Sequence, residues 1–192
     1  MNRITILQSL IDKNNYKSYL EIGVQAGHVL SAIKCPVKVG VDPDTASAAT
    51  IHNTSDGFFA NNKEQFDIIF IDGLHHADQV GKDIENSLKV LSKGGTIVMH
   101  DCLPTTKRMQ EIPLQEQSEW TGNVWKAYLK FRMTRADLDM AVVNCDWGCG
   151  IIRPGSQVPV VTEQAINYEN FCLYKEKWMN VISAEQFKAK YL

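Results

Sequence analysis

The sequence predicts a single α/β domain in which helices cover both faces of a mostly parallel β-sheet. Short apolar runs rich in β-branched residues alternate with stretches of helical periodicity through the first half of the chain, which is the pattern of successive strand and helix units. The chain has 192 residues, the size of one domain. Its composition, 44% hydrophobic and 22% charged, is that of an ordinary globular protein. No repeat, low-complexity tract or linker interrupts it, so residues 1–192 are expected to form one domain.

The first half of the chain predicts a leading helix, five strands and the helices between them. Apolar residues recur at helical spacing in residues 4–13, which predicts a short helix within residues 1–17. Gly94 is expected to stop the helix that precedes the fifth strand. Alternating strands and helices give parallel strands joined by right-handed crossovers. The expected strands are residues 18–22, 37–41, 51–54, 66–71 and 95–99, and the expected helices between them are residues 27–33 and 78–92.

The second half of the chain has a different pattern. Residues 102–119 are polar and contain two prolines, which predicts a long loop or lid. A helix is expected at residues 121–134. Residues 139–145 and 150–153 are expected to be two strands joined by a tight turn at residues 146–148, and such a hairpin fits the edge of a parallel sheet. Residues 156–192 are expected to close the domain with helices at 163–180 and 183–191, the second beginning at a capping-box pattern of Ser183 and Gln186.

Composition disfavours several classes of function. The net charge is -2 and the isoelectric point is about 6.2, whereas proteins that bind polymeric nucleic acid usually carry a basic surplus. No apolar run approaches the roughly 20 residues needed to span a bilayer, and the N-terminus has no signal-peptide pattern. The five cysteines are scattered without a C-x-x-C pair, which favours reduced thiols. We expect a cytoplasmic protein that binds a small molecule, with no nucleic-acid or membrane partner; the sequence leaves the oligomeric state open, a homodimer being one option.

The loop after the first strand carries the first functional signal. Glu21, Gly23 and Gly27 form the pattern E-x-G-x-x-x-G, and ligands of parallel sheets bind at the carboxyl ends of the strands. Gly23 lets the backbone turn sharply, and Gly27 lets the next helix begin close to a ligand. Pyrophosphate-binding loops have G-x-G-x-x-G instead, and a carboxylate at Glu21 would repel a pyrophosphate. A carboxylate suits a ligand with an amino group and a positive sulfonium, so the loop favours S-adenosylmethionine over NAD, although a purely structural pair of turn glycines would look the same.

A second acidic residue, Asp42, ends the second strand 21 residues after Glu21. An acid at this position accepts hydrogen bonds from both ribose hydroxyls of a nucleotide. Both S-adenosylmethionine and NAD carry that ribose, so Asp42 supports a nucleotide site without choosing the cofactor. The pair Asp42-Pro43 also suits a turn or a helix cap, and this interpretation stays open.

Three segments resemble the class I S-adenosylmethionine-dependent methyltransferases. Residues 19–42 look like the first two motifs of that class. The runs FDIIFIDGLHH at residues 66–76 and GGTIVMHD at residues 94–101 resemble the small bacterial group that includes macrolide-sugar O-methyltransferases and cephalosporin hydroxylase-like proteins. The resemblance covers about residues 15–155. It implies a Rossmann-like fold with a seven-stranded, mostly parallel sheet, an antiparallel edge strand and helices on both faces.

The resemblance also implies where the cofactor binds. Glu21 and Gly23 would line its methionine end, and Asp42 would bind its ribose. Ser55-Asp56 stands just before the fourth strand, where the family places an adenine contact, although an Asx turn is the alternative there. The expected cofactor-binding residues are Glu21, Gly23, Gly27, Asp42, Ser55, Asp56 and Asp72.

Acids and histidines gather at the ends of the fourth and fifth predicted strands. Asp72 ends one strand and Asp101 the other, and the ends of adjacent parallel strands are close in space, so the two carboxylates are expected to converge. Two such carboxylates suit a hard divalent cation such as Mg²⁺. Methyl transfer to a hydroxyl needs that hydroxyl deprotonated, which a cation and a nearby histidine assist. Strand-end acids can also cap helices, and His76 is expected to be structural.

In the metal-dependent sugar methyltransferases that the sequence resembles, the acid at the fourth strand end and an acid pair at the fifth bind Mg²⁺. A histidine three residues after the first acid is the base. Asp72, Asp101 and His75 stand at the matching positions. His100 departs from the pattern, because some relatives have an acid there. Histidine is a softer ligand, which favours Mn²⁺ or another transition ion, or weakens metal binding. The resemblance thus assigns Asp72, His100 and Asp101 to a metal and His75 to the role of base.

The expected function is S-adenosylmethionine-dependent O-methylation of a small hydroxyl acceptor with the help of a divalent cation. A sugar is the first choice of acceptor by family analogy, and a catechol-like acceptor is another. Two rivals are a protein that binds S-adenosylmethionine for regulation without chemistry, and an NAD-dependent enzyme. Trp125 is expected in the core, Asp146-Trp147 either in the substrate pocket or in the core, and Lys107-Arg108 on a solvated face.

Overall fold

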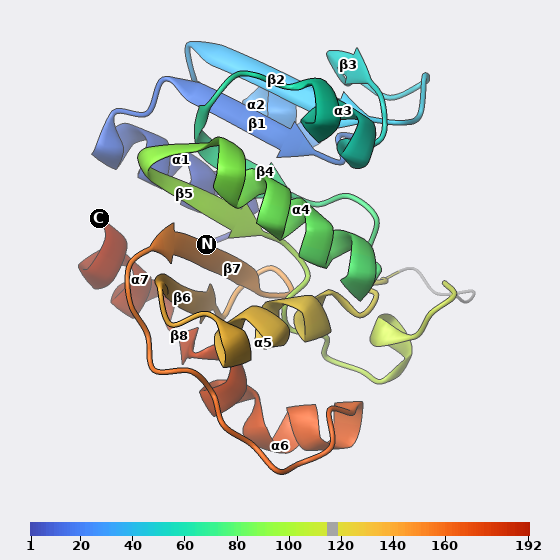
Figure 1. Cartoon of the computed structure of the whole chain (residues 1–192), viewed down its shortest axis with the longest axis vertical. Helices are drawn as coiled ribbons and strands as arrows, with labels where there is room; N and C mark the ends of the chain where they lie inside the picture. Colours follow the sequence, from blue (N-terminus) through green and yellow to red (C-terminus); the bar gives the residue numbers. More distant parts are fainter. Residues whose placement is uncertain (115–118) are drawn as a thin grey trace.

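The computed structural model describes residues 1–114 and 119–192. It has one eight-stranded sheet in the order β3-β2-β1-β4-β5-β7-β6-β8 (Figure 1). All described strands run parallel except β7, which is antiparallel to both of its neighbours. The strands are β1 (Ser18–Ile22), β2 (Val37–Asp42), β3 (Ile51–His52), β4 (Phe66–Ile71), β5 (Leu91–Met99), β6 (Leu138–Val143), β7 (Cys149–Pro154) and β8 (Val181–Ile182).

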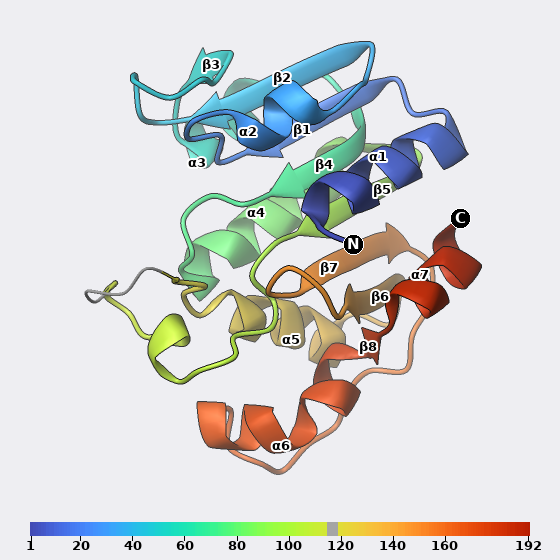
Figure 2. The same ribbon diagram turned by 180° about the vertical axis from the view of Figure 1, so that it is seen from behind.

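Helices form a layer on each face of the sheet (Figures 1 and 2). One layer consists of α1 (Arg3–Asn14), α2 (His28–Ala32) and α7 (Ala184–Tyr191). The other consists of α3 (Ser55–Asn61), α4 (Ala77–Val90), α5 (Val124–Thr134) and α6 (Tyr168–Met179), with a 3₁₀ turn at Arg108–Gln110 before α5. Two separate hydrophobic clusters of buried side chains lie between these layers and the sheet. The predicted α/β architecture is therefore confirmed.

The hairpin expected in the second half is present, with β6 and β7 paired antiparallel. Its position differs from the expectation, because β7 lies between β5 and β6 and is not the outermost strand. The sheet also has eight strands where the resemblance implied seven. The extra strand, β8, pairs with the end of β6. It has two residues, too few to show an alternating or apolar pattern in the sequence.

Several element boundaries differ from the sequence-based expectation. Gly94 does not stop α4, because that helix ends at Val90 and the chain continues directly into β5. Helix α6 begins only at Tyr168, where the side chain of Asn167 caps it, so residues 163–167 are not helical. Of the predicted lid, residues 102–114 and 119 form a loop with one 3₁₀ turn, and residues 115–118 lie outside the described part. The capping box at Ser183 is confirmed.

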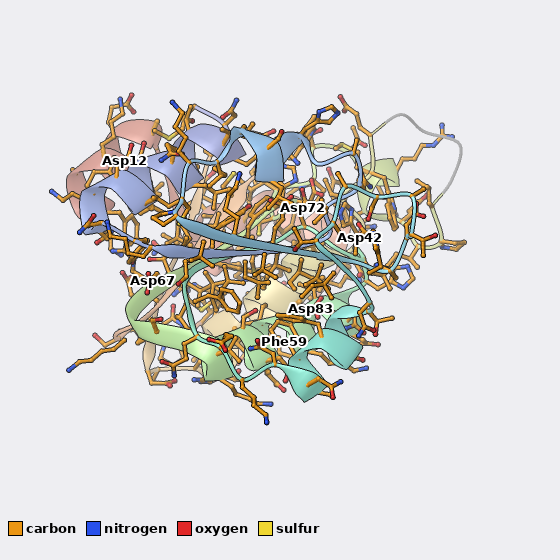
Figure 3. The ribbon with its side chains drawn as sticks, turned by 90° about the horizontal axis from the view of Figure 1, so that it is seen from above. Asp12, Asp42, Phe59, Asp67, Asp72 and Asp83 are labelled. Atoms are coloured by element: carbon orange, nitrogen blue, oxygen red, sulfur yellow. The ribbon has the colours of Figure 1, made fainter. Side chains whose placement is uncertain are left out.

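The strand order places the functional motifs together. The chain runs outward from β1 to β2 and β3 on one side, and from β4 to β5 on the other. At such a switch point the loops after adjacent strands diverge and leave a crevice at the carboxyl ends of the strands. Figure 3 shows Asp42 and Asp72 at this end of the sheet, with Asp12 and Asp67 at the opposite end. None of the described helices combines the length and hydrophobicity that a membrane crossing requires.

Candidate active site

A cavity of about 810 Å³ opens at the carboxyl ends of β1, β2 and β4. This volume lies in the range of cofactor and ligand pockets, which is about 300–1,000 Å³. Four of the expected cofactor-binding positions besides Gly23 are on its wall. The residues concerned are Asp42, Ser55, Asp56 and Asp72. The switch point thus carries a cavity of the size that a nucleoside cofactor needs.

Gly23 is the point where the loop after β1 touches the end of β4. Its φ is +88°, and a Cβ atom there would lie 2.2 Å from the backbone oxygen of Asp72. Only glycine combines this left-handed conformation with so close an approach. The nitrogen of Asp72 also donates to the oxygen of Ile22 at 2.8 Å. The backbone of the loop therefore lies directly beside Asp72.

Asp42 holds the same loop from the other side. Its Oδ2 accepts hydrogen bonds from the backbone N–H groups of Val24 and Gln25, both at 2.9 Å, and its Oδ1 accepts one from Asp44 at 2.9 Å. Burial raises the pKa of the Asp42 carboxyl, but these backbone donors outweigh it and hold the pKa below its usual value. Asp42 is thus an ionised anchor of the loop, and a carboxylate has further lone pairs to offer a ligand in the cavity.

Glu21 is buried, with 1% of its surface exposed. Its Oε2 accepts a hydrogen bond from the hydroxyl of Tyr19. Burial raises the pKa of the Glu21 carboxyl to about 7, and the hydrogen bond from Tyr19 offsets only part of that effect. In the absence of a ligand, Glu21 therefore exchanges its proton near neutral pH. A positive group nearby would favour the ionised form.

The far end of the cavity is built by α3 and α4. The Nε2 of Gln79 donates to Ser55 Oγ, Asp56 Oδ1 and Asp83 Oδ1, each at 3.1 Å. Gln79 and Asp83 both line the cavity, and sequence reasoning missed them. The sequence contains a signal for Asp83, because helical periodicity places this acid on the same face of α4 as the apolar residues Val80 and Ile84. Asp83 is 1% exposed, and burial raises the pKa of its carboxyl.

Gly27 has a different environment from the other predicted cofactor contacts. It precedes α2 with φ +75°, and a Cβ atom there would lie 2.6 Å from Cβ of Ala48. Gly27 lines neither the large cavity nor the adjoining one described next, in the part of the chain that the structure describes. Its missing side chain lets α2 pack against the loop that carries Ala48, so the structure gives it a packing role.

A second cavity, of about 270 Å³, adjoins the first. The two cavities share Gly23, Gln25, Ala26 and Asp72 as wall residues, so they meet at the end of β4. The rest of the second wall contains acids, histidines and tryptophans. These residues include Arg3, Glu21, His28, His75, His100, Asp101, Glu119, Trp120 and Trp147. The large cavity thus leads into a smaller, charged and aromatic one.

His75 lies between the two strand-end acids that were expected to converge. Its Nε2 is 3.5 Å from Asp72 Oδ1 and 3.3 Å from Asp101 Oδ2. Its Nδ1 lies 3.1 Å from the backbone oxygen of Trp120, and its ring stacks on that indole at 5.1 Å. Burial lowers the pKa of His75, but Asp72 and Asp101 outweigh it and raise the pKa above the usual value. The contact with Trp120 places the Nδ1 proton, which leaves Nε2 facing the carboxylates.

His100 is buried at the centre of the acids, with 3% of its surface exposed. Its Nδ1 is 3.1 Å from Asp101 Oδ1 and 3.5 Å from Asp72 Oδ1, and its Nε2 is 3.6 Å from Asp146 Oδ1. None of these contacts has the geometry of a hydrogen bond to a described residue. Burial lowers the pKa of His100, but the three carboxylates outweigh it and raise the pKa above the usual value.

Arg3 and Asp146 complete the cluster. The Arg3 side chain donates from Nε and Nη2 to the two oxygens of Asp146, at 2.9 and 3.1 Å, and from Nη1 to Asp72 Oδ2 at 2.9 Å. Nothing in the sequence indicated Arg3, because it lies outside every motif and 143 residues from Asp146. Trp147, beside Asp146, lines the smaller cavity and is only partly buried, so it is not in the core.

The cluster offers two sets of atoms that fit a divalent cation. In one set, Asp72, His75 and Asp101 each place a ligand atom within 4.8 Å of the others; in the second, His100, Asp146 and Cys149 do so. The two carboxylates of the first set suit Mg²⁺ or Mn²⁺, but the imidazole in this set is that of His75, where the sequence assigned His100. The second fits less well, because Arg3 already engages both oxygens of Asp146.

Three further side chains were assigned from the sequence outside the site. Trp125 is fully buried, so its place in the core is confirmed. Lys107 forms an exposed ion pair with Glu169, in which both side chains are 61% exposed, as expected for a solvated face. His76 precedes α4 and meets the indole of Trp120 edge-on at 6.2 Å.

Comparisons with known proteins agree with this arrangement. Residues 44–102 match the family model of a methyltransferase domain. This stretch runs from the wall of the large cavity to the acids after β5. A comparison with curated proteins gives no match.

Solved structures have the same fold. The O-methyltransferase of Bacillus cereus in complex with S-adenosylhomocysteine has a TM-score of 0.55 and 16% identity, over 81% of this chain and 80% of that one. TomG of Streptomyces achromogenes, an O-methyltransferase in complex with S-adenosylmethionine, has a TM-score of 0.60 and 14% identity, over 80% of both chains. The N-methyltransferase NodS of Bradyrhizobium japonicum has a TM-score of 0.51 and 18% identity, over 81% and 95%. The chain has the fold of the class I S-adenosylmethionine-dependent methyltransferases.

Proposed function

We propose that this chain is an S-adenosylmethionine-dependent O-methyltransferase that acts on a small hydroxyl acceptor. The observation that carries the proposal is the pair of cavities that meet at Gly23 and Asp72. A methyl donor in the large cavity and an acceptor in the small one would have their reacting atoms at this junction. Holding two reactants in line contributes much of the rate enhancement of such a displacement.

The cofactor would lie along the large cavity with its adenine at the far end. Ser55 and Asp56 would contact the adenine, Asp42 would contact the ribose, and Glu21 and Gly23 would lie near the methionine. Glu21 supports this orientation, because the amino group of the methionine would favour its ionised form over the protonated one. When bound, the cofactor supplies a methyl group that its positive sulfonium activates.

His75 is the residue that we assign as the general base. Its Nε2 faces the small cavity and the two acids, while the backbone of Trp120 fixes the other ring nitrogen. The neutral form of His75 would take the proton of the acceptor hydroxyl while the oxygen attacks the methyl carbon. Such a positioned base is worth about 10²–10⁴-fold in rate.

A divalent cation is part of the proposal. Asp72 and Asp101 would hold it, with His100 beside them as an imidazole donor. Such an ion lowers the pKa of a bound hydroxyl and orients it. His100 favours Mn²⁺ over Mg²⁺. We expect turnover to fall after exhaustive chelation and to return with Mn²⁺ more fully than with Mg²⁺; full turnover in chelated enzyme would remove the cation from the proposal.

The volume of the small cavity suits an acceptor with about one ring. Its walls include two tryptophans and several charged groups, and flat aromatic faces suit both sugar rings and catechol-like rings. We propose a sugar hydroxyl as the first acceptor class to test. A panel of free sugars, sugar nucleotides and catechols, assayed for methyl transfer, would decide between these classes.

The test of the reaction is substitution of His75 by Ala. We expect kcat to fall about 10²-fold or more, while the Kd for S-adenosylmethionine stays the same, because His75 does not line the large cavity. His52→Ala, a substitution of an exposed histidine on β3, is the control and should leave kcat unchanged.

The same measurements separate the rival functions. Unchanged turnover in His75→Ala would remove this residue from the mechanism. Tight binding of S-adenosylhomocysteine with no product from any acceptor would indicate a binding protein without chemistry. Binding of NAD in place of S-adenosylhomocysteine would overturn the proposed cofactor.

A further inference from the structure

Arg3 bonds directly to the side chain of Asp72 from outside the sheet and its strand-end loops. It enters the cluster from the first turn of α1, which lies outside every methyltransferase motif. Its side chain uses three separate N–H donors on two carboxylates, Asp72 and Asp146. A guanidinium matches this task because its donors form a rigid planar fork.

We propose that Arg3 and Asp146 form a clamp that fixes the Asp72 carboxylate for methyl transfer, an inference that rests on the proposed function. Arg3 holds Oδ2 of Asp72 at 2.9 Å. This leaves Oδ1 to face His75 and His100, each at 3.5 Å. The clamp thereby decides which oxygen of Asp72 points at the reacting groups, and Arg3 acts through Asp72 as a positioning residue.

The clamp is anchored at its α1 end. The backbone N–H of Arg3 donates to Asp146 Oδ2 at 2.8 Å, so Asp146 satisfies one of the free N–H groups in the first turn of α1. The helix itself packs on the sheet through Ile6, Leu7 and Leu10, all fully buried. Asp146 therefore fixes both the side chain and the backbone of Arg3, and the guanidinium has little freedom to leave Asp72.

The clamp is also anchored at its β6–β7 end. Asp146 and Trp147 have φ of 49° and 55°, a left-handed conformation that such side chains rarely adopt. The backbone oxygen of Trp147 accepts from Leu103 at 2.7 Å, and that of Gly148 accepts from Cys102 at 3.0 Å, which ties this turn to the segment after Asp101. Strained backbone that is held by its surroundings is typical of functional sites.

The negative charges of the cluster explain why a positively charged side chain is needed at the position of Arg3. Asp72, Asp101 and Asp146 bring three carboxylates within reach of one imidazole, His100. Unpaired carboxylates this close would repel each other and turn away. Arg3 is always charged, so it holds two of the three in place.

The test compares kcat and KM in variants of Arg3. We expect Arg3→Met to lower kcat about 10²-fold, because a small misplacement of a catalytic group costs about this much, with little change in the KM of the acceptor or the Kd of S-adenosylmethionine. Arg3→Lys should restore part of kcat, because it keeps the charge but not the fork. Arg135→Met is the matched control: Arg135 forms an exposed two-bond pair with Asp137 and should leave kcat unchanged. A loss confined to KM would overturn the clamp, because Arg3 would then contact the acceptor.

A double-mutant cycle makes the result specific for Asp72. In an Asp72→Asn background, Arg3→Met should lower kcat less than about 2-fold further, because the clamp has lost its target. The same cycle measured by urea unfolding should give a coupling of about 5-fold or more in the unfolding equilibrium constant. Independent effects in both cycles would overturn the proposal. If the wild-type enzyme methylates no acceptor, the proposed function fails, and the unfolding cycle still decides whether Arg3 holds Asp72.

Discussion

At the scale of single residues, the protonation of Glu21 gives a property that can be tested without a ligand. The pKa of its buried carboxyl is about 7, against an ordinary value of 4.5. The folded state therefore binds this proton more tightly than the unfolded state does. Its contribution to stability is fully present below about pH 4.5 and is lost as the pH rises to about 7.

Glu21→Gln should remove this pH dependence. A shift of one pKa unit corresponds to about 1.4 kcal/mol, so between pH 5 and pH 8 the wild-type protein should lose about 2.5 kcal/mol relative to the variant. Urea unfolding of both proteins at the two pH values, without cofactor, measures the difference. A constant difference at pH 5 and pH 8 would show that Glu21 is already ionised at pH 5.

Gly23 gives a second prediction at this scale. In Gly23→Ala, the new methyl group would meet the backbone of Asp72 at 2.2 Å, and the left-handed conformation would add about 1–2 kcal/mol of strain. We expect a loss of about 2 kcal/mol or more in stability and at least a 10-fold weaker Kd for S-adenosylhomocysteine. Gly81→Ala is the control: nothing lies within 4 Å of its added Cβ, and the helix should gain up to about 1 kcal/mol. Unfolding and calorimetric titration of both variants check this.

The residues of the candidate site that could be predicted from the sequence are those near the carboxyl ends of predicted strands. Glu21 and Asp42 lie at the carboxyl ends of parallel strands, Asp72 and Asp101 come just after such strands, and the carboxyl ends of parallel strands meet at one edge. Arg3 could not be predicted, because its contacts depend on how α1 packs against the turn between β6 and β7. No local pattern encodes a contact across 143 residues.

At the scale of elements, Asn123 joins the beginnings of α4 and α5. Helix α4 has no cap from its own preceding residue, His76. Instead, Oδ1 of Asn123 accepts from the nitrogen of Ala77 at 2.6 Å, and the nitrogen of Asn123 donates to the oxygen of His75 at 3.1 Å. Asn123 thus takes the place of an N-cap and holds the segment that carries His75.

Asn123→Ala should therefore affect both stability and catalysis. We expect a loss of about 1 kcal/mol, the usual cost of a lost N-cap, and a several-fold lower kcat, because the His75 segment loosens. Asn167→Ala removes a similar cap from α6, which lines neither cavity among the described residues. It should cost the same stability with normal kcat. Equal kcat in the two variants would contradict the link between Asn123 and His75.

The sequence predicted long, periodic elements better than short ones. The strand β4 has a near-continuous apolar run, and β1 and β2 are rich in β-branched and aromatic residues; the expected bounds of all three agree with the structure within one residue. Helix α3 was missed, because Ser55-Asp56-Gly57 resembles a turn and the helix has seven residues. Its first turn depends on the side chain of Thr54, which caps it through Gly57, and on packing of Phe58 into the core.

At the scale of the whole molecule, acidic side chains lie at both ends of the sheet, but both cavities open at only one of them. Asp42 and Asp72 lie at the carboxyl end of the strands and Asp67 at the other end (Figure 3). Asp67 accepts backbone hydrogen bonds from Lys17 and Ser18 at 2.7 and 3.2 Å and lines neither cavity in the described chain. The two ends of the sheet should therefore respond differently to the same kind of substitution.

Thermal unfolding with and without ligand tests this difference. A ligand that binds only the folded state at 100 times its Kd adds about 2.7 kcal/mol, which raises the Tm of a chain of this size by about 5–10 °C. S-adenosylhomocysteine should give this rise in the wild-type protein, and NAD should give none. Asp67→Ala should lower the Tm without ligand but keep the full rise, since the Asp67 side chain bonds to residues 17 and 18 and to Ser92 at the other end of the sheet. At the same ligand concentration, the Tm of Asp42→Ala should rise much less. This variant lacks the carboxylate that accepts hydrogen bonds from the loop after β1 and that we propose as the acceptor for the ribose hydroxyls. A full rise in Asp42→Ala would mean that the ligand binds away from the switch point.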